Sequence, residues 1–128
     1  MKQYLLGIDI GTSACKIAIF DGDGRVIASG NGDYPVYYPQ AGWAEQNPEE
    51  WWSAVCRAVR ETLEKGKVNP GEIAGIGIDG QSWSAIPMDK NGEVLTNTPI
   101  WMDTRAADIC EEAVSYTHLR AHETAANL

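Results

Sequence analysis

The pattern of apolar and polar positions divides the first thirty residues into three short strands. Apolar runs cover residues 4–9, 15–20 and 25–29, and the segments between them are rich in glycine, aspartate and small hydroxyl residues. Runs of this length between turn residues are typical of β-strands. Because the connections are too short to hold a crossover, the pattern predicts an antiparallel three-stranded meander.

A helix is predicted after an irregular stretch at residues 30–47. Asn47 is a favourable N-cap, Pro48 suits the first helical position, and Gly66 is placed to end the helix. Apolar residues recur at helical spacing between these ends, which predicts one buried face. The predicted buried face consists of Trp51, Trp52, Val55, Ala58, Val59, Thr62 and Leu63.

Shorter elements are predicted in the second half of the chain. Residues 73–79 form an apolar run suited to a central strand. Three strands followed by a helix and a returning strand predict a mixed α/β sheet rather than a doubly wound fold, which alternates strand and helix from the start. Further predicted elements are strands at 84–88 and 94–95 joined by a turn at 89–92, a short buried stretch at Ile100 and Trp101, and a helix from Arg105 to Cys110 capped by Thr104.

Composition and charge narrow the classes of function. The chain has 128 residues, with 18 acidic and 10 basic side chains and a net charge of -8. A protein that binds duplex nucleic acid needs a basic surface, so nucleic acid is not an expected partner. No run approaches the roughly 18 apolar residues of a membrane span, and the N-terminus lacks the pattern of a signal peptide. We therefore expect a cytoplasmic protein without a membrane partner.

Candidate chemistry is concentrated where the first predicted strand meets the second. Asp9 ends the first strand, and Gly11, Thr12 and Ser13 follow as a turn. Such a turn can direct backbone N–H groups and two hydroxyls toward an anion, while a carboxylate beside it can hold Mg²⁺. Lys16 brings a positive charge to the same place. The alternative is a plain hairpin, and the spacing matches neither a Walker A loop nor a GxGxxG turn.

Four segments resemble a known family. The string GIDIGTSACKIAIFD resembles the first phosphate motif of the actin and sugar-kinase superfamily. The other segments are similar to motifs of the FGGY carbohydrate kinases, and within that family the pattern most resembles the xylulokinases. They are AGWAEQNPEEWW at 41–52, IGIDGQSW at 76–83 and PIWMDTR at 99–105, so the resemblance covers residues 4 to about 112.

The resemblance implies a fold and an activity. FGGY kinases transfer the γ-phosphate of ATP to a sugar hydroxyl with Mg²⁺, in a cleft between two ribonuclease-H-like domains. The expected fold is therefore α/β, an incomplete N-terminal domain of the ribonuclease-H-like type (the actin and sugar-kinase superfamily), with a mixed sheet that begins with the antiparallel meander. The expected cofactors are ATP and Mg²⁺. The expected substrate is a small-molecule sugar, a ketopentose such as xylulose. We expect the full-length protein to form a homodimer.

The same resemblance implies roles for individual residues. Asp9 would position the metal, and Lys16 would lie near the transferred phosphoryl group. Ser82 and Trp83 replace the Met-His pair of the xylulokinases, which leaves the sugar open, and ordinary core packing is the alternative reading of Trp83. The implied ATP phosphate-binding residues are Gly11, Thr12, Ser13 and Lys16, and the implied substrate-binding residues are Gln81, Ser82, Trp83, Trp101 and Asp103.

The resemblance covers only part of such a kinase. The catalytic general base, the adenosine-binding loops and the second domain are expected downstream, so we expect no catalytic residue in this chain and an inactive isolated chain. A different class of function also remains open. It is a non-enzymatic nucleotide-binding or scaffolding domain built on the actin-like fold.

The end of the chain differs from the rest. We predict a partial kinase domain at residues 1–113 and a non-homologous tail at residues 114–128. Through plausible codons, the tail resembles a translated transposase-type sequencing adapter, which predicts that it is an artefact. The alternative is a native C-terminal helix in which His118 and His122, four residues apart, form a metal pair.

Overall fold

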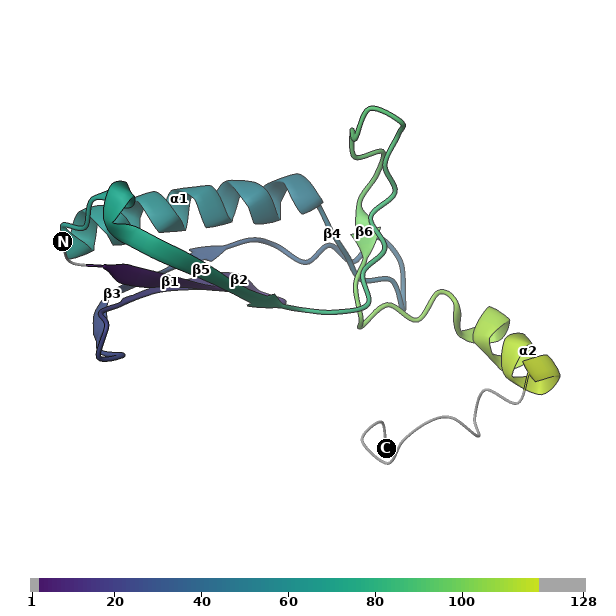
Figure 1. Ribbon diagram of the computed structural model, residues 1–128. Helices are drawn as coiled ribbons and strands as arrows, with labels where there is room; N and C mark the ends of the chain where they lie inside the picture. The colour runs from purple at the N-terminus through teal and green to yellow at the C-terminus, as the bar shows by residue number, and fades with distance from the viewer. Residues whose placement is uncertain (1–2, 118–128) are drawn as a thin grey trace.

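The computed structural model of the chain describes residues 3–117. His118 and His122, which the sequence offers as a metal pair, lie outside the described residues. Figure 1 shows a sheet with α1 packed along one face and α2 set apart from both. The elements are β1 (Tyr4–Ile10), β2 (Ala14–Phe20), β3 (Val26–Asp33), β4 (Glu45–Gln46), α1 (Pro48–Gly66), the short 3-10 helix η1 (Pro70–Glu72), β5 (Ile73–Gly80), β6 (Thr98–Pro99) and α2 (Ala107–Thr117).

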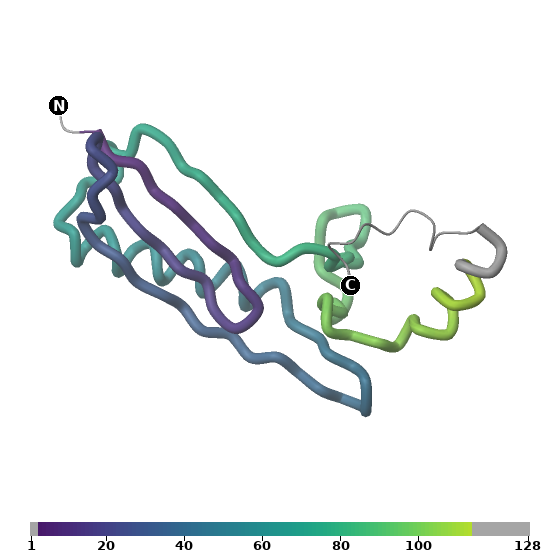
Figure 2. The backbone as a smooth tube through the Cα atoms, turned by 90° about the horizontal axis from the view of Figure 1, so that it is seen from below, coloured from purple at the N-terminus to yellow at the C-terminus, as the bar shows by residue number. Residues whose placement is uncertain are grey.

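The main sheet is mixed, with strand order β3-β2-β1-β5. β2 pairs antiparallel with both β1 and β3, which confirms the predicted meander. β5 returns after α1 and pairs parallel with β1, so that Asp9 lies opposite Asp79 and Ile10 opposite Gly80. Figure 2 shows these strands running side by side. The carboxyl ends of β1 and β5 therefore meet at one edge of the sheet.

The core lies between α1 and the strands of the meander. Cys15, Ile17 and Ile19 alternate along β2 on the face toward α1, and each is at most 1% exposed. The helix approaches β3 closely, because a Cβ on Gly32 would lie only 2.8 Å from the carbonyl oxygen of Ala54. Glycine at this position allows the backbone of the strand to pack directly against the helix.

Local chemistry sets both ends of α1. The side chain of Asn47 accepts a hydrogen bond from the N–H of Glu49 at 3.0 Å, as expected of an N-cap. The helix ends at Gly66 as predicted, but the left-handed residue is Lys67, with a φ of 51°. Gly66 serves packing instead, since a Cβ there would lie 3.1 Å from the Cβ of Ala28.

Three helical residues correct the predicted buried face. Trp52 is 67% exposed, and Ala54 is buried in its place. Trp51 is half-buried against the core. Helical spacing predicted the buried face of α1 but not which residues lie at its border. The reason is that α1 lies over β2 and β3 rather than over the centre of the whole sheet.

The predicted strand at residues 73–79 is present as β5, but it is an edge strand of the described sheet rather than a central one. Ile76 and Ile78 point to the same side as the core residues of β1, yet they are exposed because α1 does not reach them. Parallel pairing with β1 holds β5 in place. The strand therefore carries apolar side chains that the described residues leave uncovered.

Residues 81–105 contain less regular structure than predicted. The expected strands at 84–88 and 94–95 reduce to one bridge between Met88 and Val94, above a turn in which the N–H of Gly92 donates to the oxygen of Asp89. Ile100 is buried as expected, but Trp101 is more than half exposed. These residues lack a neighbouring strand with which to form a ladder.

The second helix differs from its prediction at both ends. α2 runs from Ala107 to Thr117 rather than from Arg105 to Cys110, and the Thr104 hydroxyl donates to the carbonyl oxygen of Gly42 at 3.0 Å instead of capping it. β3 also extends to Asp33, into the stretch predicted to be irregular.

Among the described helices, none combines the length and the apolar character needed to cross a membrane.

Candidate functional site

A pocket of about 400 Å³ lies where the carboxyl ends of β1 and β5 meet. Ligands commonly bind beyond the carboxyl ends of parallel strands, because the loops there converge. Seven of the ten residues predicted to bind phosphate, metal or sugar line this pocket, and Ser13, Lys16 and Asp103 do not. The lining residues are Asp9, Gly11, Thr12, Gly80, Gln81, Ser82, Trp83 and Trp101.

The loop between β1 and β2 has all three of its carbonyl oxygens bonded to the protein. The oxygen of Gly11 accepts from the hydroxyl of Tyr34, and that of Ser13 accepts from the backbone N–H of Tyr34. The oxygen of Thr12 accepts from Nε2 of Gln46 at 2.6 Å. Within residues 3–117, the N–H groups of Thr12 and Ser13 have no protein acceptor. The loop therefore offers donors to a ligand, which suits an anion.

Gly11 shapes this loop rather than contributing a free donor. Its N–H donates to the carbonyl oxygen of Ala14 at 3.1 Å, which closes the turn. A Cβ on Gly11 would also lie 3.1 Å from that oxygen, so a side chain would press against the turn. The predicted phosphate contacts thus fall to the two residues that follow Gly11.

Tyr34 supports the loop from beneath. Burial raises the pKa of its hydroxyl to about 12, with smaller contributions from Cys15 and the negative charge of Asp9. The hydroxyl therefore remains protonated and continues to donate to Gly11 throughout the neutral range.

Asp9 lies between Lys16 of β2 and Asp79 of β5 in the register of the sheet. Paired residues of neighbouring strands share a face, so these side chains lie on the face opposite α1. Lys16 lines a second hollow of about 480 Å³ on that face, together with Asp9 and Asp79. Asp9 belongs to both hollows and thus links the positive charge of Lys16 to the pocket.

The carboxylates of Asp9 and Asp79 suit Mg²⁺ by their chemistry. Mg²⁺ prefers oxygen ligands and usually takes one or two carboxylates, completing its shell with water and phosphate oxygens. Among the described residues, no group of three or more metal-ligating side chains is present. The donor set fits a magnesium ion shared with a phosphate ligand rather than one held by the protein alone.

The segment after β5 forms the opposite wall of the pocket. The N–H of Gln81 donates to the oxygen of Ile10 at 2.8 Å, and a Cβ on Gly80 would lie 2.9 Å from that oxygen. Glycine thus lets the two strand ends approach closely. Trp83 is 82% exposed and has a φ of 67°, so it is not packed in the core formed by the described residues. Left-handed backbone at a bulky residue is strained, and such strain clusters at functional sites.

Trp101 joins the two walls. Its Nε1–H donates to Oγ1 of Thr12 at 2.9 Å. Because an indole N–H can only donate, the Thr12 hydroxyl is the acceptor, and its own proton is directed to another partner. The exposed indole ring also supplies an apolar surface to the pocket.

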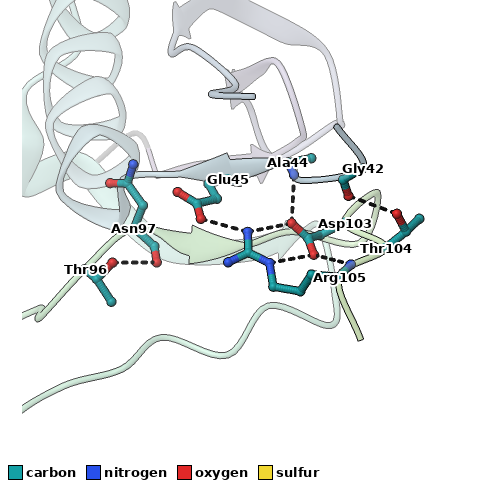
Figure 3. A network of polar contacts seen from close by, with 8 residues as sticks. All are labelled: Gly42, Ala44, Glu45, Thr96, Asn97, Asp103, Thr104 and Arg105. Atoms are coloured by element: carbon teal, nitrogen blue, oxygen red, sulfur yellow. Dashed lines mark hydrogen bonds and ion pairs between the residues drawn. The ribbon is translucent and has the colours of Figure 1, made fainter. Parts of the chain in front are cut away.

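Asp103 lies outside the pocket, in the polar network of Figure 3. Its carboxylate accepts from the N–H of Ala44 at 2.7 Å and from the guanidinium of Arg105 at 2.7 and 2.8 Å. Arg105 also pairs with Glu45 at 2.7 Å and stacks over the ring of Trp43. The hydrogen bond from Arg105 holds the pKa of Asp103 well below its usual range. The network fastens residues 103–105 to residues 42–45.

Four residues of the site were not predicted from the sequence. They are Gln46, Tyr34, and Asp79 and Gly80 at the end of β5, within the segment 76–83 that resembles a family motif. Gln46 lies within the segment 41–52 that resembles a family motif, and a polar residue immediately before an N-cap in such a motif was the available signal. Tyr34 offered no signal beyond its aromatic ring. Tyr34 and Gln46 both donate to backbone carbonyl oxygens of the loop, and Gln46 also accepts from the side chain of Gln81.

Residues 4–124 match the model for the FGGY family of carbohydrate kinases, N-terminal domain. The range of that match includes residues 114–124. The division of the chain at residue 113 stays a prediction.

Relatives and solved structures agree with this match. A glycerol kinase from Thermococcus gammatolerans is 40% identical over 112 residues, which are 88% of this chain and 23% of the relative. A gluconate kinase from Lactobacillus acidophilus superposes with a TM-score of 0.83 at 31% identity, over 91% of this chain and 23% of the other. A ligand-bound xylulose kinase from Lactobacillus acidophilus superposes with a TM-score of 0.81 at 32% identity, over 89% of this chain and 23% of the other.

These comparisons confirm the predicted fold class. The mixed sheet with its antiparallel meander and its parallel pair is that of the N-terminal domain of sugar kinases. The chain spans 23% of the length of these three relatives.

Proposed function

The chain belongs to the FGGY family of carbohydrate kinases, and from that premise we propose that it forms the N-terminal part of an ATP-dependent kinase acting on a hydroxyl of a small sugar. The observation that carries the proposal is the pocket itself. It places a loop with free N–H donors, a carboxylate and two exposed indoles around one space. A phosphate donor and a polyhydroxylated acceptor need this combination of groups.

On the phosphate side, the N–H groups of Thr12 and Ser13 hold the phosphates of ATP. The Thr12 hydroxyl adds a donor, because it already accepts from Trp101. Asp9, with Asp79 beside it in the sheet, would hold Mg²⁺, and Lys16, paired with Asp9, would lie near the transferred phosphoryl group. When bound, Mg²⁺ would neutralise charge that develops on the phosphoryl oxygens.

On the sugar side, the proposed substrate is a ketopentose such as xylulose. Gln81 and Ser82 supply polar partners for hydroxyls, and Trp83 and Trp101 supply apolar surface for the C–H face of a sugar. A ligand-bound xylulose kinase among the superposed structures supports this choice. The names of the relatives make glycerol and gluconate the natural competitors in a test.

The test is ATP-dependent phosphorylation by the longer protein that contains this chain, with xylulose, glycerol and gluconate as acceptors. The highest kcat/KM is expected for xylulose. A preference for glycerol would overturn the ketopentose assignment, and ATP binding without transfer to any acceptor would favour the non-enzymatic alternative. The isolated chain is expected to show no turnover because the general base is proposed to lie outside it, and turnover by residues 1–128 would refute that point.

A matched pair of tryptophan variants sharpens the assignment of the sugar side. Trp83→Ala is expected to raise KM for the sugar about tenfold, because the contact between an indole and a ligand contributes on the order of 1 kcal/mol or more. KM for ATP should change less. Trp52→Ala removes another exposed indole, from α1 and away from the pocket, and should leave both constants unchanged. Equal effects of the two variants would remove Trp83 from the site.

A further inference from the structure

Gln46 is a fully buried polar residue at the centre of the site, with 0% of its surface exposed. Its Nε2 donates to the carbonyl oxygens of Thr12 at 2.6 Å and Pro35 at 3.2 Å. Its Oε1 accepts from Nε1 of Trp51 at 3.1 Å and from Nε2 of Gln81 at 2.8 Å. One amide therefore contacts the phosphate-side loop, α1 and the sugar-side turn at once.

The neighbours of Gln46 permit only one orientation of its amide. Backbone carbonyl oxygens can only accept, so the amino group of Gln46 must face Thr12 and Pro35. An indole N–H can only donate, so the oxygen of Gln46 must face Trp51. Rotation of the amide by 180° would place its oxygen against the carbonyl oxygens of Thr12 and Pro35. It would also place its amino group against the indole N–H of Trp51.

The orientation of Gln46 in turn determines that of Gln81. The oxygen of Gln46 requires a donor on the Gln81 side, so Gln81 presents its amino group to Gln46. The remaining oxygen, Oε1 of Gln81, is shielded from solvent and has no hydrogen-bond partner among the described residues. A buried acceptor without a donor is unfavourable, and native structures usually supply a partner from the protein, from water or from a ligand.

We propose that Gln46 is a positioning residue, whose single buried amide holds the Thr12 loop and the side chain of Gln81 in one fixed arrangement. Gln81 lines the pocket, so its orientation shapes the wall that a ligand meets. The expected effect on the sugar rests on the proposed function. The orientation of the two amides does not.

The first test measures hydrogen exchange of the side-chain amides by nuclear magnetic resonance in the 128-residue chain. Both amino protons of Gln46 and one of Gln81 are expected to exchange at least about tenfold more slowly than those of Gln40, which is exposed. Exchange of the Gln46 protons at the rate of Gln40 would show that the network is absent and overturn the proposal. This measurement requires neither kinase activity nor a variant.

The second test is a double-mutant cycle in the longer protein with Gln46→Met and Gln81→Met. Each single substitution is expected to raise KM for the sugar about tenfold, as one hydrogen bond contributes roughly a factor of ten. The double variant should show no more than the larger single effect, because Gln46 acts through Gln81. Gln40→Met is the control for an exposed glutamine.

The outcomes separate this inference from the proposed function. Additive effects of Gln46→Met and Gln81→Met, or no change in either, would reduce Gln46 to a packing residue. If the longer protein phosphorylates none of the acceptors, the proposed function fails, while slow exchange of the Gln46 and Gln81 amides would still uphold the orientation. If Gln46→Met does not fold, the exchange rates in the native chain decide the question.

Discussion

The sheet–helix unit, formed by β1–β3 and α1, and the clasp, formed by residues 81–105, are stabilised by different forces. The unit buries a continuous apolar cluster that includes Ile17 and Ala54. In the clasp, only Thr98 and Ile100 are buried, and polar contacts join it to Thr12 in the loop between β1 and β2 and to Glu45 and Gln46 of β4. Burial of apolar side chains stabilises the fold but does not depend on their orientation. A hydrogen bond, in contrast, forms only at a defined distance and angle between its donor and acceptor. The pocket lies at the boundary, where a stable support meets directed polar groups.

The largest expected effect comes from the core of the unit. Ile17→Ala should lower the free energy of unfolding by about 3 kcal/mol, because it removes buried methyl and methylene groups and leaves a cavity. Urea denaturation measures the change. Ile27→Ala, at a partly exposed position on β3, should cost well under half as much. Similar losses at the two positions would contradict a stability concentrated between α1 and β2.

In the clasp, Asp103→Ala should cost about 2 kcal/mol, since it removes a nearly buried partner of Arg105 and of the Ala44 N–H. The pKa of Asp103 is lowered in the folded state. The carboxylate therefore stabilises the fold above about pH 4, and that contribution is lost as the pH falls further.

Urea denaturation of Asp103→Ala and the native chain at pH 7 and at pH 3 measures this effect. The difference between the two proteins should shrink at the lower pH. Asp108→Ala, on the exposed surface of α2, is the matched control and should be neutral. A pH-independent difference would indicate that packing, not the charge, fastens the clasp.

At the boundary, Tyr34→Phe should cost about 1 kcal/mol because the hydroxyl no longer donates to Gly11. The pKa of Tyr34 is raised in the folded state to about 12, so its protonated form stabilises the fold fully below about pH 10. That contribution is lost as the pH rises from about 10 toward 12. Stability of the native chain should fall more steeply over this range than stability of Tyr34→Phe, and parallel curves would argue against the buried hydroxyl.

The smallest effect is expected at Trp52, where substitution by alanine should change the free energy of unfolding by less than about 0.5 kcal/mol. Trp51→Ala is the matched comparison on the same helix. It should cost at least about 1 kcal/mol more, because Trp51 packs on the core and donates to Gln46. Equal costs would restore the predicted buried face.

Elements with strong local signals followed the sequence closely. The meander and α1 were predictable because turn residues, a capping asparagine and apolar spacing act within a few positions of one another. The strands expected at 84–88 and 94–95 failed because alternation alone does not supply a pairing partner. Trp101 was expected to be buried by residue type, yet its N–H contact with Thr12 holds it at the surface of the pocket.

The candidate site divides in the same way. Asp9, Thr12 and Gln81 were identifiable because they follow strands in short motifs. The parallel pairing of β1 with β5 then brought these motifs to one edge. Asp103 lies in the segment expected near the sugar, but Arg105 and the N–H of Ala44 occupy its carboxylate. A motif shows that a residue is present, and the competition among its neighbours decides what it contacts.

The sequence by itself determined the strands of the meander, the bounds of α1 and the chemistry of the loop after β1, because these depend on interactions between residues near in the chain. Only the tertiary structure decided the roles of Gln46 and Tyr34. Their partners lie 34 and 35 residues away for Gln46 and 23 residues away for Tyr34. A hydrogen bond forms only when its donor and acceptor meet at about 3 Å with the correct orientation. Strand pairing and helix packing establish that proximity, and no local pattern encodes it.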